Sequence, residues 1–167
     1  MKKWLLVPVL FLTFVLSGCF SDPVQEDLLV YLNEDLAEIA HLENEALSAY
    51  ESVTGANYTD DYILYEMMLL EVIPTYQRFE TELESIKVKT DELREAHEIY
   101  IEAVNLQSNA FIRIVTALEE YDRAKIEEAN QMLSEARKLF RDYNHEIERL
   151  ADEHNVELTG PVDGEVL

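Results

Sequence analysis

Apolar residues recur at alternating steps of three and four along most of this chain, and that spacing restricts the fold more than any other feature. Because an α-helix has about 3.6 residues per turn, such residues fall on one stripe along its side. Long stripes of this kind are typical of helices that pack in bundles or coiled coils. We therefore predict an all-α fold. Four stripes can be traced, over Leu29–Val53, Tyr62–Ile86, Leu93–Tyr121 and Ile126–Leu150. The first begins with Leu29 and Leu32, and the second with Tyr62, Tyr65 and Leu69.

Residues that begin or end helices divide the chain at the same places. Asp22 is a good N-cap, because a proline follows it at the first helical position. Gly55 is a typical helix end, and Thr59, Thr90 and Asp122 are the predicted starts of three further helices. The predicted helices cover about residues 23–54, 60–89, 91–121 and 123–155.

The lengths of these helices and of their connections predict an architecture. A helix of about 30 residues is roughly 45 Å long. Because the connections are short, we expect an antiparallel, up-down-up-down four-helix bundle over residues 23–155. In an alternative with three helices, one is very long and coiled-coil-like, since the second and third stripes stay in phase across Lys89 and Thr90. Pro74 is predicted to kink the second helix without breaking it, because the stripe continues on both sides.

The first 18 residues have the features of a secretory signal peptide. Lys2 and Lys3 give a positively charged start, and residues 4–15 are almost entirely apolar. That run is shorter than the roughly 18–20 apolar residues of a membrane-spanning helix. A buried core helix would alternate apolar with polar positions, and this segment does not.

The segment Leu16-Ser17-Gly18-Cys19 resembles the lipobox of bacterial lipoproteins, and Cys19 is the only cysteine of the chain. The resemblance implies that the Cys19 thiol is diacylated, that residues 1–18 are cut away, and that residues 19–22 form a lipidated anchor and short linker. Two acyl chains on one residue give stable membrane attachment. The implied location is extracytoplasmic, with the lipid anchor in the outer face of the cell membrane of a Gram-positive bacterium.

Small, uncharacterised lipoproteins of Gram-positive bacilli resemble this chain in two helical segments, ELREAHEIYIEAVNLQSNAF and EANQMLSEARKLFRDYNHEIERLADEHNVEL. That similarity implies a surface-anchored helical domain with no assigned activity. The last segment, residues 156–167, contains turn-forming residues without periodicity, so we predict that it is a disordered tail.

The chain is strongly acidic, with 35 aspartates and glutamates, 13 lysines and arginines, and a net charge of −22. Residues 1–18 hold two lysines and no acid, so their removal changes the net charge to −24. So negative a surface repels phosphate backbones, and nucleic acid is not an expected partner. The simplest role of the charge is to keep the protein soluble and monomeric. The alternatives are attraction of cations and adaptation to an alkaline or salty exterior.

Three polar residues, Glu43, His97 and Gln107, interrupt stripes that are otherwise apolar or aromatic. Counting along the helices puts Glu43 and Gln107 near one level, and His97 lower, near the level of Tyr100. A buried polar layer can fix the register of packed helices. The alternative is a ligand-binding site formed by these four residues.

The tyrosines allow a similar choice, because six of the nine lie in the second, third and fourth stripes. Aromatic residues at helical spacing usually form the core, although phenols could also line a ligand cavity between helices. The six are Tyr62, Tyr65, Tyr76, Tyr100, Tyr121 and Tyr143.

The sequence predicts no catalytic residues and no metal site. Glu38 and His41 have the E-x-x-H spacing of di-iron bundles, but they lie opposite the apolar stripe and should face water. We therefore expect a non-enzymatic binding or structural domain, with the membrane as one partner through Cys19 and a protein as a second. The alternative function is a sensor that binds a small ligand or metal cation in a polar pocket between helices. No cofactor is expected.

Overall fold

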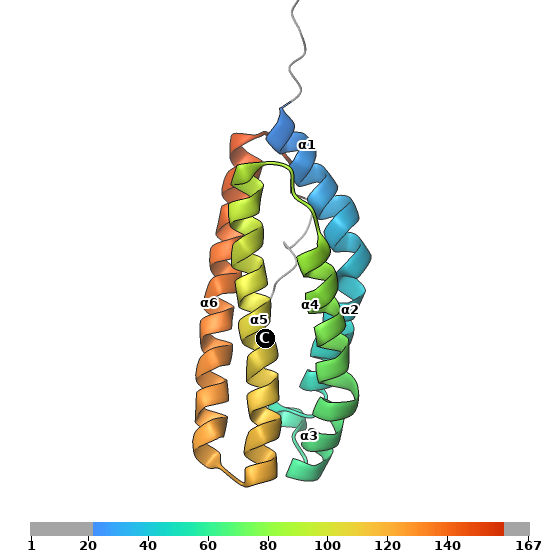
Figure 1. Ribbon diagram of the computed structural model, residues 1–167, viewed down its shortest axis with the longest axis vertical. Coiled ribbons are helices and arrows are strands. Elements are labelled where there is room, and N and C mark those ends of the chain that lie inside the picture. Colours follow the sequence, from blue (N-terminus) through green and yellow to red (C-terminus); the bar gives the residue numbers. More distant parts are fainter. Residues whose placement is uncertain (1–21, 159–167) are drawn as a thin grey trace, which may run out of the picture.

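The computed structural model describes residues 22–158, drawn in colour in Figure 1. Every regular element in this range is a helix, and the range contains no β-strand, so the predicted all-α class is confirmed. The predicted signal peptide, the lipidation site Cys19 and residues 159–167 of the predicted tail lie outside the described residues. None of the helices in the described range is long and apolar enough to cross a membrane.

The helices of this range form four segments separated by short connections. The first consists of α1 (Pro23–Val30), a π turn, η1 (Tyr31–Asp35), and α2 (Leu36–Glu51). A short 3-10 helix, η2 (Gly55–Asn57), precedes the second segment, which consists of α3 (Asp61–Met67), a π turn, η3 (Met68–Val72), and α4 (Ile73–Ser85). The third and fourth segments are single helices, α5 (Asp91–Glu120) and α6 (Arg123–Glu153).

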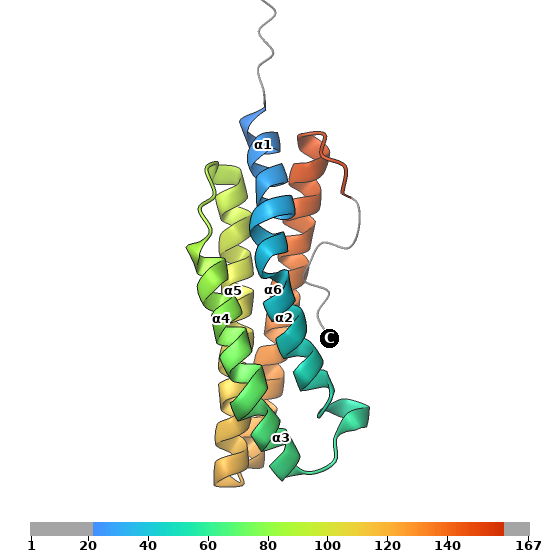
Figure 2. The ribbon, with the colours of Figure 1, turned by 90° about the vertical axis from the view of Figure 1, so that its right-hand side faces the viewer.

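The four segments lie along one long axis, as Figures 1 and 2 show from two directions. α5 packs along α6, and α2 packs along α4. We call one end of the molecule the near end. It contains the start of α1, the end of α6 and the connection between α4 and α5. The opposite end, which we call the far end, contains η2, α3, the adjoining η3 and the turn between α5 and α6.

The connection at residues 86–90 separates α4 from α5, so the alternative of one very long helix across Lys89 and Thr90 is wrong. The buried Asp27 carboxylate holds this connection against α1. Its Oδ2 accepts hydrogen bonds from the backbone nitrogens of Lys89 and Thr90, both at 2.8 Å, and from the Thr90 hydroxyl at 2.9 Å. Thr90 therefore precedes α5 as predicted, but its side chain bonds to Asp27 and does not cap the helix.

Aspartates cap the starts of the other three segments. Asp22 and Asp122 cap α1 and α6 through their carboxylates, as predicted. In the second segment the cap is Asp60, one residue after the predicted Thr59. Its Oδ1 accepts hydrogen bonds from the backbone nitrogens of Tyr62 and Ile63 at 2.9 and 3.0 Å. Both residue types make good caps, and here the chain starts the helix one position later.

The π turn η1 rotates the start of the first segment relative to the prediction. A π turn contains one residue more than an α turn, so the residues before it shift by one position on the helix surface. Leu28 and Tyr31 are buried in place of the predicted Leu29 and Leu32, and Leu29 is 42% exposed.

The second π turn, η3, directly precedes Pro74. In an α-helix the proline ring would clash with the carbonyl group four residues earlier, and the missing N–H would leave that carbonyl unbonded. The backbone N–H of Ile73 instead bonds to the carbonyl oxygen of Met68, five residues earlier. The helix is thus widened next to Pro74 and continues through it.

This π turn shifts the second stripe in the same direction as η1 shifts the first. Leu64 and Met68 are buried, whereas the stripe predicted Tyr62, Tyr65 and Leu69 at the core. Tyr62 is 64% exposed, Leu69 is exposed and Tyr65 is only half-buried. Two short irregularities therefore decide which aromatic side chains reach the surface.

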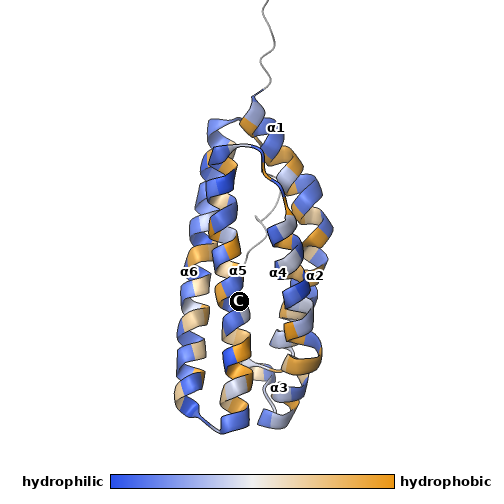
Figure 3. Cartoon of the chain, in the orientation of Figure 1, coloured by the Kyte–Doolittle hydropathy of each residue, from blue (hydrophilic) through white to orange (hydrophobic). Residues whose placement is uncertain are grey.

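The third and fourth stripes match the prediction over nearly their whole length. Hydrophilic residues cover much of α6 in Figure 3, and its buried residues recur at steps of three and four. Each large apolar side chain that is fully buried contributes roughly 1.5–3 kcal/mol to stability. The buried stripe of α6 consists of Ala129, Leu133, Ala136, Phe140, Tyr143, Ile147 and Leu150.

Candidate functional site

The predicted ligand-binding residues, Glu43, His97, Tyr100 and Gln107, all lie in the interior. Glu43 comes from α2 and the other three come from α5. Their exposed fractions range from 1% for Tyr100 to 7% for Glu43. At such burial a polar atom needs a hydrogen-bond partner to offset the loss of water.

Tyr100 and Glu43 form one buried pair. The Tyr100 hydroxyl donates a hydrogen bond of 3.0 Å to Glu43 Oε2. The Tyr100 ring stacks on Tyr143 of α6, with the ring centroids 4.5 Å apart and the planes inclined by 15°. Burial, followed by the negative charge of Glu43, raises the pKa of Tyr100 well above its ordinary value, and the same causes raise the pKa of Tyr76. Both phenols are therefore neutral at physiological pH.

His97 and Tyr31 form a second buried pair. His97 Nδ1 lies 3.1 Å from the Tyr31 hydroxyl oxygen, and the rings meet edge to face with centroids 5.5 Å apart. Burial lowers the pKa of His97, which favours its neutral form. Its Nε2 is buried without a hydrogen-bond partner among residues 22–158. Tyr31 was not among the predicted core residues, because the π turn that directs it inward leaves no mark in the spacing of apolar residues.

Gln107 lies seven residues after Tyr100 in α5, about two turns toward the far end. Its Oε1 is buried without a hydrogen-bond partner in the described part of the chain. Glu43 accepts a hydrogen bond from Tyr100, which the sequence analysis had placed at the level of His97 and not at that of Glu43.

Both hydrogen-bonded pairs join the first segment to α5. Tyr31 lies in η1 and Glu43 in α2, while His97 and Tyr100 belong to α5. A pair of this kind fixes how two helices are aligned, because sliding one along the other would leave a buried polar group unbonded. The arrangement suits an architectural role, since the helices would have to separate before a ligand could reach these side chains.

The E-x-x-H pair lies on the surface. Glu38 and His41 are both exposed, and His41 Nδ1 lies 3.0 Å from the backbone oxygen of Glu38. They line an open groove of about 600 Å³ between the first segment and the end of α4, together with Arg78 and Lys89. Within residues 22–158, no group of three or more His, Cys, Asp and Glu side chains could hold a metal ion.

The far end carries most of the exposed apolar side chains. Eight large ones are exposed in the described range, and five of these come from residues 58–70. A sixth, Tyr121, is 90% exposed in the turn between α5 and α6. Exposed apolar groups gathered on one part of a surface mark sites of interaction. The five are Tyr58, Tyr62, Ile63, Leu69 and Leu70.

Two hollows open at the far end. The larger has a volume of about 620 Å³ and extends from Tyr58 and α3 to the start of α6. The smaller, which we call the tip hollow, has a volume of about 290 Å³ and lies between the start of α3 and the end of α5. The tip hollow is lined by Asp61, Tyr62, Tyr65, Leu118, Glu119 and Tyr121.

Three tyrosines in this region, Tyr58, Tyr62 and Tyr65, donate hydrogen bonds to carboxylates. These hydrogen bonds are the main reason that the pKa of each of the three tyrosines is raised. The bond from Tyr65 also ties α3 to α5. The donors and acceptors are Tyr58 to Asp61 Oδ1 at 2.8 Å, Tyr62 to Glu66 Oε1 at 2.5 Å and Tyr65 to Glu119 Oε1 at 2.8 Å.

The stripes had assigned Tyr62, Tyr65 and Tyr121 to the core, and the structure corrects these assignments. The π turn before Pro74 turns Tyr62 and Tyr65 outward. Tyr121 directly follows α5 with a φ of 55°, in the left-handed region that ends helices. Glycine is the usual residue in that position, so the tyrosine itself did not mark the helix end, which was predicted from the helix start at Asp122.

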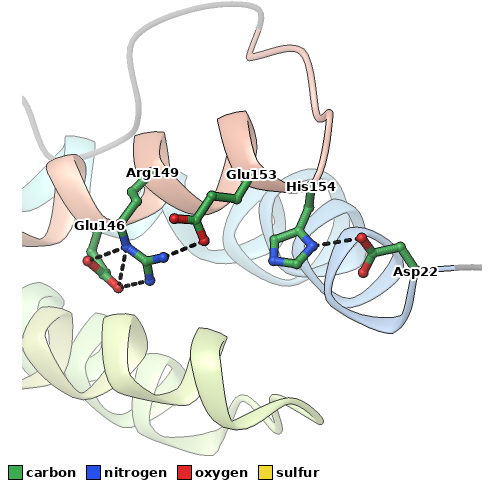
Figure 4. A network of polar contacts seen from close by, with 5 residues as sticks. All are labelled: Asp22, Glu146, Arg149, Glu153 and His154. Atoms are coloured by element: carbon green, nitrogen blue, oxygen red, sulfur yellow. Dashed lines mark hydrogen bonds and ion pairs between the residues drawn. The ribbon is translucent and has the colours of Figure 1, made fainter.

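At the near end, the start of α1 is tied to the end of α6 (Figure 4). Asp22 Oδ2 lies 2.7 Å from His154 Nδ1, and this hydrogen bond is the main cause that lowers the pKa of Asp22. Gln25 Nε2 donates hydrogen bonds to the backbone oxygens of His154 and Asn155 at 2.8 and 3.3 Å. The first and last helices of the described range are therefore joined where the chain enters the domain.

Arg149 bonds to Glu146 and Glu153 on the same helix, close to this tie (Figure 4). Both carboxylates raise the pKa of Arg149, and Arg149 lowers the pKa of Glu146. Exposed ion pairs within one helix contribute about 0.3–0.5 kcal/mol each. This network therefore supports the last turns of α6 and adds little to the stability of the whole domain.

No protein-family model matches the chain, and no curated protein or solved structure is similar to it. Function is therefore inferred from the geometry of the chain itself.

Proposed function

We propose that the chain is an extracytoplasmic bacterial lipoprotein, anchored through Cys19 in the outer face of the cell membrane, with a non-enzymatic helical domain that binds a partner or has a structural role. The proposed scaffold is an antiparallel, up-down-up-down four-helix bundle. The proposal draws on the lipobox-like segment and on the contrast between the two ends of the domain.

The near end is the end that a lipid at Cys19 would hold. Cys19 precedes Pro23, the first residue of α1, by four residues. Because a chain spans at most about 3.6 Å per residue, four residues reach no farther than about 14 Å. α5 has 30 residues, so the domain extends about 45 Å from this end. The far end would then be the part that is most accessible from outside the cell.

The observation that carries the binding role is the gathering of exposed apolar side chains at the far end. A structural spacer needs no such surface, whereas exposed apolar side chains gathered in one region mark a site of interaction. The tie between Asp22 and His154 supports the same reading, because it fixes the end to which the anchor connects. A protein in the cell envelope is the partner class that we propose for this surface.

A Cys19→Ala variant tests the anchor. Without the thiol no acyl chain can be attached, so we expect the variant to lose incorporation of labelled palmitate. It should be stranded with residues 1–18 still attached, or, where these are removed, leave the detergent-rich phase on phase separation. Its helical circular-dichroism signal and melting temperature should be unchanged, because Cys19 precedes the first helix. A Ser17→Ala variant, which keeps the cysteine, is the matched control. If a processed Cys19→Ala protein partitions with detergent as the parent does, the lipoprotein proposal is wrong.

The second candidate function is a sensor for a small ligand or metal cation that uses Glu43, His97, Tyr100 and Gln107. The observation in its favour is that His97 Nε2 and Gln107 Oε1 are buried without hydrogen-bond partners among the described residues. A ligand bound only by the folded state raises the melting temperature. A shift with a divalent metal that disappears in Glu43→Leu/Gln107→Leu would favour the sensor over the surface-binding module.

A further inference from the structure

We infer that the tip hollow binds a quaternary ammonium group, held against the tyrosine rings that line it and attracted by the carboxylates beside them. The inference rests on the proposed function only in treating the domain as a binding module, and it does not require the lipid anchor. Three tyrosines and two acids line the hollow, and its lining contains no lysine or arginine.

The lining selects for positive charge. The face of an aromatic ring carries partial negative charge and attracts a cation within about 6 Å of the ring centre. Tyr62 and Tyr65 come from α3, Tyr121 comes from the end of α5, and Asp61 and Glu119 add formal negative charge from the same two elements. The acidic surface of the whole chain, with its net charge of −22, raises the local concentration of any cation.

The hydrogen bonds of the region favour a quaternary ammonium over a primary one. A primary ammonium carries three N–H groups, each of which needs an acceptor. One oxygen of each lining carboxylate already accepts a hydrogen bond, Asp61 Oδ1 from Tyr58 and Glu119 Oε1 from Tyr65. The other two carboxylate oxygens are fewer than the three N–H groups of a primary ammonium, whereas three tyrosine side chains supply aromatic surface. A quaternary ammonium has no N–H to satisfy, and its methyl groups can pack against the rings and Leu118.

Tyr121 supports a binding role on separate grounds. It holds a left-handed φ of 55° at the end of α5, where glycine is the common residue and a bulky side chain is strained. It is also 90% exposed, so no burial within the domain offsets that strain. Strained residues of this kind gather at ligand sites.

The size of the hollow limits the ligand. Binding pockets for small molecules typically have volumes of roughly 300–1,000 Å³. At about 290 Å³ the tip hollow matches a head group, and a larger molecule would have to extend beyond it.

The test uses the full-length chain in a non-ionic detergent and choline chloride as the probe. Binding is followed by the broadening of the choline methyl signal in proton NMR, with sodium chloride adjusted to keep the ionic strength constant. We expect saturable binding of choline. Dimethylbutanol, the uncharged analogue in which carbon replaces the nitrogen, should not bind, and ethanolamine, the primary amine, should bind more weakly than choline.

Two variants locate the site. Tyr121→Gly should melt at the same or a higher temperature, because glycine suits a positive φ, and yet bind choline about two- to fivefold more weakly, as expected for one ring contact. Glu119→Gln should weaken binding without loss of the fold. The matched controls are Leu70→Ala, an exposed apolar change outside the hollow, and Glu102→Gln, an exposed acid in the middle of α5.

Several outcomes would overturn the inference. Equal binding of dimethylbutanol would mean that only apolar contact operates, and equal or tighter binding of ethanolamine would mean that the carboxylates alone select the ligand. Unchanged choline affinity in Tyr121→Gly would place any binding elsewhere. Because the measurement is made on purified protein, none of these results depends on where the chain is located in the cell, and Cys19→Ala should bind choline normally.

Discussion

Variants of the hydrogen bond from Tyr100 to Glu43 test whether the buried polar residues have an architectural role or form a ligand site. In Tyr100→Phe the carboxylate loses this donor while the ring stays in place, so we expect the free energy of unfolding to fall by about 1–3 kcal/mol. In the double variant Glu43→Leu/Tyr100→Phe the buried charge is absent, and stability should recover to the parent value or exceed it. Chemical denaturation followed by circular dichroism measures both.

Tyr121→Phe is the matched control for this pair, because it removes a hydroxyl that is already in water. It should change the free energy of unfolding by no more than about 0.5 kcal/mol. A double variant that is less stable than either single variant would show that Glu43 and Tyr100 do more than satisfy each other.

Single residues also show why the interior was only partly predictable. Three polar residues within apolar stripes are predicted to lie in the core, and all three are buried: Glu43, His97 and Gln107. Their partners depend on the rotation of the neighbouring helix, which a stripe on one helix does not specify. Tyr31 is the clearest case, since a shift of one residue before η1 brings it to His97.

At the scale of the element, the two π turns explain most of the differences between the residues predicted to be buried and those that are buried in the structure. α5 and α6 have no such turn, and their stripes were predicted nearly to the last residue. Pro74 gave a visible signal for η3, although as a kink and not as an extra residue. η1 has no nearby proline, and nothing in its sequence predicted it. The aromatic surface at the far end follows from η3, so it could not be derived from the stripes.

Deletion of Leu70 tests this account of η3. Leu70 is exposed within the π turn, and removing one residue there would leave an α turn with the buried residues on both sides still facing the core. With Pro74 present the α turn should clash, so the deletion alone should be about 3 kcal/mol less stable than the deletion combined with Pro74→Ala. The combined variant should have close to parental stability in thermal melts.

The control for this deletion is removal of Asn109, an exposed residue of the regular helix α5. There a missing residue rotates the buried stripe away from the core, and the domain should unfold. If the combined Leu70 and Pro74 variant is as unstable as the Asn109 deletion, η3 is not a one-residue insertion in an otherwise continuous stripe.

At the scale of the whole molecule, the two ends and the surface charge determine behaviour in solution. The near end is closed by contacts between the first and last helices, and the far end presents the tip hollow and most of the exposed apolar groups. This polarity along one axis came only from the three-dimensional arrangement. The sequence predicted helices and an acidic surface, but not that tyrosines would gather at the end opposite the start of α1.

The acidic surface gives the last prediction. With 35 acids against 13 lysines and arginines, like charges repel one another across a domain of this size, and folding brings them closer together. Sodium chloride shortens the screening length from about 30 Å at 0.01 M to about 8 Å at 0.15 M. We therefore expect the melting temperature of the full-length chain in non-ionic detergent to rise by a few degrees over that range.

A charge variant separates this effect from general salt effects. Four exposed acids on three different segments, each without a hydrogen bond or ion pair in the described contacts, can be changed to glutamine together. This variant should melt higher than the parent at 0.01 M salt and gain less from added salt, because less repulsion remains to be screened. A melting temperature that falls with salt would mean that attractive ion pairs such as Arg149–Glu146 dominate the surface. The four acids are Glu45, Glu71, Glu95 and Glu102.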